Sequence, residues 1–157
     1  MRNLDATDAR LLLALSDNPR ATGLELAARL GLSRNTVQAR LTALESQPAL
    51  HAFDTRVHPE ALGYPLTAFI TTQVNQHQLA RVGDALAAVP EVIEVHGLTG
   101  ATDLLVRVVA RDPDDLYRLA ELVLGIPGVE RTSIALSMRE MVRYRVAPLL
   151  NRRILGE

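Results

Sequence analysis

Side chains that could carry covalent chemistry are scarce in this chain. Cysteine is absent, which excludes thiol nucleophiles, disulfides and thiolate metal sites. All 17 basic residues are arginines, so no Schiff base can form on a lysine. The histidines His51, His58, His77 and His96 are too scattered to predict a zinc site. We therefore expect no catalytic residue, no metal and no cofactor.

Residues 33–42 instead offer hydrogen-bonding groups that suit the edges of DNA bases. Amide side chains pair well with adenine and guanidinium groups with guanine in the major groove. Apolar residues at helical spacing, Val37, Leu41 and Leu44, define a buried side of one helix, and no acid occurs between Ser33 and Glu45. The sequence predicts that this helix contacts double-stranded DNA through Ser33, Arg34, Asn35, Thr36, Gln38, Arg40 and Thr42.

These residues have different expected roles. Asn35 and Gln38 are the best candidates for reading bases, whereas Arg34 suits a phosphate contact. Arg40 lies on the flank of the apolar stripe and could equally pair with an acid of its own domain. A three-helix bundle that merely has a polar outer face is the alternative interpretation.

Two preceding helices would position this segment. Asp5 can cap the first helix, with Asp8 in its first turn. Thr22–Glu25 has the spacing of a capping box for the second. Gly31–Ser33 then forms a tight turn, and Ser33 caps the third helix. This order is typical of a helix-turn-helix.

The second half of the chain contains an internal repeat. Apolar residues of one expected helix recur 37 positions later in another, with Leu79, Val82, Leu86 and Val89 matching Leu116, Leu119, Val123 and Ile126. Strands are expected at 66–74, 92–98, 103–111 and 129–138. Two β-α-β units predict a ferredoxin-like βαββαβ domain, with a four-stranded antiparallel sheet covered on one face by two helices.

The predicted architecture is α+β, with four segments. They are a (winged) helix-turn-helix domain at 1–48, a strand-bearing linker at 49–65, the βαββαβ domain at 66–138 and an arginine-rich tail at 139–157. Strands such as 104–109 are apolar on both sides, so a second subunit should bury the uncovered sheet face. The tail is interpreted as a solvated terminus, with a DNA-facing or intersubunit role as the alternative.

The charge and hydropathy of the chain limit the kinds of partner that it can have. The formal net charge of −1 excludes DNA binding by bulk electrostatics, so any basic surface must be local. No stretch approaches the roughly 18 apolar residues of a membrane span, and no leader-like apolar segment follows Met1. We expect a cytoplasmic protein without a membrane partner.

In the order and spacing of several short segments, the chain resembles the Lrp/AsnC regulators, also called feast/famine regulatory proteins. The resemblance implies a winged helix-turn-helix, a linker strand and a domain that forms dimers or octamers and commonly senses amino acids. The segments that carry it are Leu4–Asp8, Ala27–Ser33, Arg40–Glu45, Leu62–Tyr64, Thr99–Asp103 and Ile126–Val129 with Thr132.

The resemblance also indicates an effector site in the loop between the second and third strands. Its expected residues are Thr99, Gly100, Ala101, Thr102, Asp103 and Thr132. Backbone amides and hydroxyls would hold a carboxylate, and Asp103 would pair with an ammonium. The alternative is a plain turn in which Gly100 adopts a positive φ. Ala101 and Thr102 depart from the family, where an acidic or polar residue and an aromatic are common.

The expected function is sequence-specific transcriptional regulation by a homodimer, which could assemble into a tetramer or octamer, in response to an amino acid or related metabolite. One competitor is an enzyme of the similar haem-pathway (sirohaem) decarboxylase architecture. Residues 97–103 lack the His and Arg that such an enzyme would carry near these strands. An effector-independent DNA-binding protein is a further alternative. A metabolite buffer that no longer binds DNA would carry acids or bulky apolar groups on the outer face of the third helix, and neither is present.

Overall fold

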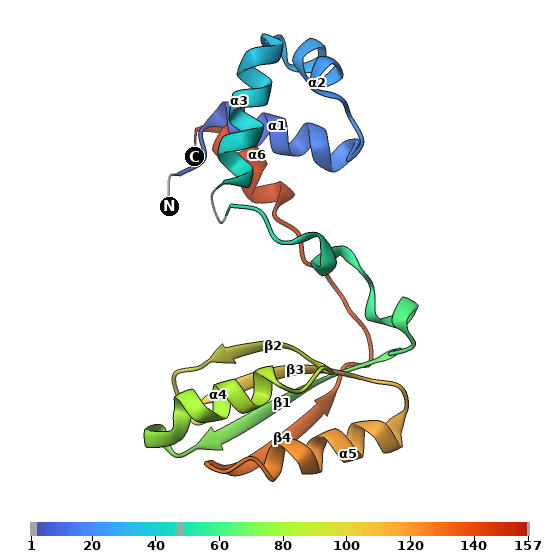
Figure 1. The fold of residues 1–157 in the computed structure, drawn as a ribbon, viewed down its shortest axis with the longest axis vertical. Coiled ribbons are helices and arrows are strands. Elements are labelled where there is room, and N and C mark those ends of the chain that lie inside the picture. The colour runs from blue at the N-terminus through green and yellow to red at the C-terminus, as the bar shows by residue number, and fades with distance from the viewer. Residues whose placement is uncertain (1–2, 47–48, 157) are drawn as a thin grey trace. The chain divides into compact units, whose positions relative to one another are not determined.

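The chain forms two units, which Figure 1 shows in a computed structural model that describes residues 3–46 and 49–156. The first unit contains the described residues as far as Thr55 together with those from Val142 onward. The second unit is Arg56–Met141. The chain therefore crosses between the units twice. The predicted boundary at residue 48 lies outside the described residues.

Three helices of the first unit begin and end as their capping residues predict. They are α1 (Ala6–Asp17), α2 (Gly23–Leu30) and α3 (Arg34–Glu45). The Asp5 carboxylate accepts hydrogen bonds from the Thr7 and Asp8 amides, and Thr22 and Glu25 form the predicted capping box. Gly31 ends α2 at a φ of 66°, a conformation that favours glycine. Leu11, Leu26, Val37 and Leu44 form the shared core.

The arginine-rich tail differs from its prediction, because part of it folds onto the first unit. Helix α6 (Ala147–Leu155) packs against α1, and Leu150 is buried there. The Arg153 Nε donates a hydrogen bond of 2.6 Å to the Leu4 carbonyl. Pro148 near the start of α6 and Gly156 at its end, with a φ of 80°, are the signals that define this helix in the sequence.

The linker also differs from its prediction. Among residues 49–65 the structure has no strand and instead contains two 3-10 helices, η1 (Phe53–Arg56) and η2 (Pro59–Leu62). Pro59 starts η2 and Gly63 ends it at a φ of 88°. A strand is stable only when another strand pairs with it, and the sheet formed by the described residues contains only β1 to β4. The first unit likewise has no wing strand among its described residues.

The second unit is the predicted βαββαβ domain. Strands β1 (Leu66–Val74), β2 (Val92–Gly97), β3 (Leu104–Ala110) and β4 (Val129–Leu136) form one sheet in the order β2-β3-β1-β4. All three pairings are antiparallel. Helix α4 (Leu79–Ala87) follows β1, and α5 (Pro113–Leu124) follows β3. A short 3-10 helix, η3 (Gln76–Gln78), leads into α4.

The two faces of this sheet have different surroundings. Alternate strand residues such as Ile70, Val106 and Val108 are buried in one cluster with α4 and α5, because successive side chains of a strand point to opposite faces. The helix residues in that cluster include Val82, Leu86 and Val123. No helix of the second unit covers the other face within the described residues, and we call it the open face. No helix that the structure describes is long and apolar enough to span a membrane.

Replacing Leu150 by Ala should lower the free energy of unfolding of the first unit by about 2 to 3 kcal/mol, because a buried leucine is lost from the α1–α6 contact. The neighbouring Leu149→Ala is the matched control, since Leu149 is 64% exposed and Leu150 is 8% exposed. Denaturant titration followed by circular dichroism measures both. Equal losses for the two variants would show that α6 does not belong to the first unit.

Candidate functional site

The outer face of α3 presents amide, hydroxyl and guanidinium groups to solvent. Asn35, Gln38 and Thr42 are exposed, and Arg34 is exposed at the N-terminal end. Val37 and Leu44 are buried on the opposite side. The helix carries no acid in its first turn, and its only acid is Glu45 at the last position. This face can therefore donate and accept hydrogen bonds without repelling a polyanion.

Ser33 and Thr36 mainly serve the start of α3. The Ser33 Oγ accepts a hydrogen bond of 3.1 Å from the Thr36 amide, which is the predicted N-cap. The Ser33 and Thr36 hydroxyls also lie 2.8 Å apart. These bonds fix the first turn of α3 and hold the amides near its N-terminus in place. Such a terminus suits an anion such as phosphate.

Arg40 turns inward, which corrects its predicted place on the DNA-contacting surface. Its Nη1 donates to Asp5 Oδ2 at 2.7 Å and to Asp8 Oδ1 at 2.7 Å. Asp8 is fully buried, so its charge needs a partner in the protein. Hydrogen bonding to Arg40 lowers the pKa of Asp5 to about 2, and both acids raise the pKa of Arg40. Of the two interpretations that the sequence allowed, the pairing within its own domain is the one the contacts favour.

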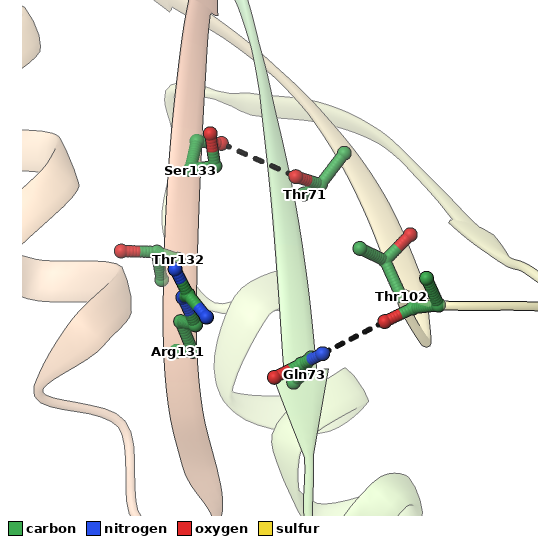
Figure 2. Close-up of a pocket in the computed structure, with 7 residues that line it drawn as sticks. Thr71, Gln73, Thr102, Arg131, Thr132 and Ser133 are labelled. Carbon is green, nitrogen blue, oxygen red and sulfur yellow. Dashed lines mark hydrogen bonds between the residues drawn. The ribbon is translucent and has the colours of Figure 1, made fainter.

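The second candidate site is a pocket of about 220 Å³ at one end of the open face (Figure 2). It lies where β1, β4 and the loop between β2 and β3 meet. Of the predicted effector residues, Ala101, Thr102 and Thr132 line it, whereas Thr99, Gly100 and Asp103 do not. The remaining lining residues are Thr71, Gln73, Arg131 and Ser133.

Asp103 serves the loop rather than the pocket. Its Oδ2 accepts a hydrogen bond of 2.8 Å from the Val74 amide, and its Oδ1 accepts one of 2.6 Å from the Gln76 side chain. Its backbone also bridges the end of β1 to the loop, through bonds to the Thr72 carbonyl and the Leu98 amide. These bonds engage both carboxylate oxygens within the protein, whereas the sequence led us to expect that Asp103 would pair with a ligand ammonium. Gly100 has the expected positive φ, at 120°.

Sequence reasoning missed Thr71, Gln73, Arg131 and Ser133. In the β1–β4 register, Thr71 lies opposite Ser133 and Gln73 opposite Arg131, so all four side chains share the open face. This register depends on which strands are neighbours in the folded sheet. The two-residue alternation along 71–73 and 131–133 was the signal that could have found them. Across the described part of the chain, no three His, Asp or Glu side chains gather as a metal site requires.

Two family models match the chain, one in each half. The model described as AsnC-type helix-turn-helix domain matches residues 4–45, and the model described as Lrp/AsnC ligand binding domain matches residues 67–147. The chain is also similar to the HTH-type transcriptional regulator FL11 of Pyrococcus horikoshii. The two are 32% identical over 129 residues, which is 82% of this chain and 85% of the relative.

Solved structures resemble the chain over nearly its whole length. AsnC of E. coli superposes with a TM-score of 0.84 at 23% identity, covering 94% of this chain and 100% of that one, which bears on the fold alone. A transcriptional regulator of Neisseria meningitidis in complex with L-Met superposes with a TM-score of 0.79 at 27% identity, covering 94% of this chain and 99% of that one.

Replacing Arg40 by Met should destabilise the first unit by about 3 kcal/mol, because it leaves the buried Asp8 without its arginine partner. Arg29→Met is the matched control. Arg29 pairs with Asp17 on the surface, where the side chains are 51% and 64% exposed, so its loss should cost less than about 1 kcal/mol. Denaturant titration compares the two. A loss at Arg40 no larger than that at Arg29 would contradict a positioning role.

Proposed function

The chain belongs to the Lrp/AsnC family of helix-turn-helix transcriptional regulators, and we propose that α3 is its recognition helix. Asn35 and Gln38 read base edges in the major groove, and Thr42 follows on the same face. The observation that supports this proposal best is the exposed amide and hydroxyl face of α3, which lies opposite the buried Val37 and Leu44 and bears no acid.

The other α3 residues support this contact in different ways. Arg34 neutralises a phosphate at the N-terminal end of the helix, which sets affinity rather than sequence preference. Ser33 and Thr36 hold the first turn in place through their mutual hydrogen bonds. Arg40 contributes indirectly, since it joins α3 to α1 through Asp5 and Asp8.

A homodimer through the open face is the second part of the proposal. Phe69, Leu105 and Ala135 share this face by strand register, and no helix of their own unit covers them. Burying such apolar side chains against a second copy releases their surface from water. A two-fold dimer would present two copies of α3 to a roughly palindromic site. Tetramers or octamers would form from such dimers.

A small-molecule effector is the third part. The pocket at the end of the open face has polar side chains, and its volume of about 220 Å³ lies below the roughly 300 Å³ at which pockets for drug-sized ligands begin, so it suits a ligand as small as an amino acid. The similar regulator of Neisseria meningitidis was solved with L-Met, and we propose that an amino acid or a close relative of one binds this chain. Because the pocket opens on the proposed dimer face, ligand binding would shift the assembly equilibrium.

Asn35→Ala and Gln38→Ala should each weaken binding to the operator by about 1 to 3 kcal/mol and leave binding to random DNA nearly unchanged. Arg34→Ala should weaken both and reduce the salt dependence, because it removes a phosphate contact. Fluorescence anisotropy with operator and scrambled duplexes over a salt series measures these effects. An operator preference that survives both amide substitutions would place base reading elsewhere.

Phe69→Glu on the open face should shift the full-length chain from dimer to monomer, because a charge would then lie in the interface without a partner. Tyr117→Glu is the control, since Tyr117 is exposed on α5, on the helix-covered side. Analytical ultracentrifugation gives the masses. A wild-type monomer, or a dimer that Phe69→Glu leaves intact, would exclude the open face as the interface.

A further inference from the structure

We propose that the pocket binds its ligand as a carboxylate through Arg131 and does not require an ammonium group, so that 2-oxo acids bind at least as well as the matching amino acids. This inference rests on the proposed effector function and adds the chemical class of the ligand. It also gives Arg131 the role of anchoring the ligand, which the sequence alone did not indicate.

Arg131 is the charged side chain that lines the pocket. It is exposed, and within the described part of the chain no acid forms an ion pair with it. Beside it on the open face stand the hydroxyl residues Thr71 and Ser133, whereas the register places the side chain of Thr132 with that of the buried Thr72 on the other face. A guanidinium group flanked by hydroxyls forms strong, charge-assisted hydrogen bonds to a carboxylate.

Gln73 extends the polar lining towards the loop. Its Nε2 donates a hydrogen bond of 2.8 Å to the Ala101 carbonyl, so that both groups are already engaged. Figure 2 shows Gln73 between Arg131 and the loop residue Thr102, with the amide nitrogen directed towards the loop. The amide oxygen is thus on the side of Arg131, where it can accept a hydrogen bond from a ligand hydroxyl or amide.

The pocket offers an ammonium group no opposite charge. No Asp or Glu is among its lining residues. Asp103 is the nearest acid in the loop, but both of its oxygens accept hydrogen bonds from Val74 and Gln76. On the same sheet face Glu94 lies on the far edge strand, where it pairs with His96 and Arg107. An ammonium in the pocket would therefore meet neutral acceptors and the like charge of Arg131.

The experiment removes one charged group of the ligand at a time. Isothermal titration calorimetry on the full-length protein compares the standard amino acids, their 2-oxo acids and the amines that lack the carboxylate, such as leucine, 4-methyl-2-oxopentanoate and 3-methylbutylamine. The expected result is that an oxo acid binds as tightly as its amino acid or more tightly, and that the amine does not bind.

Substitution of Arg131 supplies the second arm. Arg131→Gln should weaken binding of the same acid by about tenfold or more, and Arg131→Lys should retain part of the affinity, because one charge-assisted hydrogen bond is worth about that factor. Arg81→Gln is the matched control, since Arg81 is an exposed arginine on α4 that does not line the pocket. Sedimentation of each variant shows whether its oligomeric state is unchanged.

The outcomes separate this inference from the effector function on which it rests. Binding that is unaffected by Arg131→Gln, an amino acid that binds tenfold tighter than its oxo acid, or an amine that competes with the acid would each overturn the inference alone. A wild-type protein that binds no compound of the panel would overturn the effector function itself, and the inference with it.

Discussion

The buried carboxylate of Asp8 is the constraint on which the first unit depends. A charge inside a protein must find a partner, and Asp8 finds it in Arg40 of α3, the helix with the polar outer face. The same guanidinium binds Asp5, which in turn caps α1, so one side chain ties the start of α1 to the middle of α3. With Arg40 held inward, the side of α3 that carries Asn35 and Gln38 must face solvent. The direction of the face that we propose reads DNA thus follows from the satisfaction of a buried charge.

The second unit shows how a duplicated sequence produces an asymmetric site. Two similar β-α-β halves build the sheet and its helix-covered core, yet the loop from Thr99 to Asp103 occurs only in one half. Asp103 fastens this loop to the end of β1, and Gly100 supplies the positive φ that the turn needs. The pocket forms where this loop meets β4, beside the open face that the proposed dimer would cover. A ligand there would lie close to the interface, which connects its binding to assembly.

Much of the fold follows from local rules that the sequence displays. The caps Asp5, Thr22 and Ser33 fix the helix starts, and the apolar repeat predicts the sheet with its two covering helices. The features that could not be predicted from the sequence depend on contacts between segments that are distant along the chain. Helix α6 has capping signals in Pro148 and Gly156, but only its packing on α1 shows that it belongs to the first unit. The inward role of Arg40 depends on its distance to Asp8, which the sequence does not give. The place of Arg131 in the pocket depends on the pairing of β4 with β1. The linker strand was predicted wrongly, because strand propensity without a pairing partner does not make a strand.

This chain is a transcriptional regulator, and we propose that it reads specific DNA with α3. Genome-wide mapping of the DNA bound by the full-length protein in its own cells tests it most directly, with an Asn35→Ala, Gln38→Ala double variant as the reference. The expected result is a set of discrete sites that share a roughly palindromic motif and vanish in the double variant. A profile without enriched sites, or the same sites in both proteins, would contradict the claim.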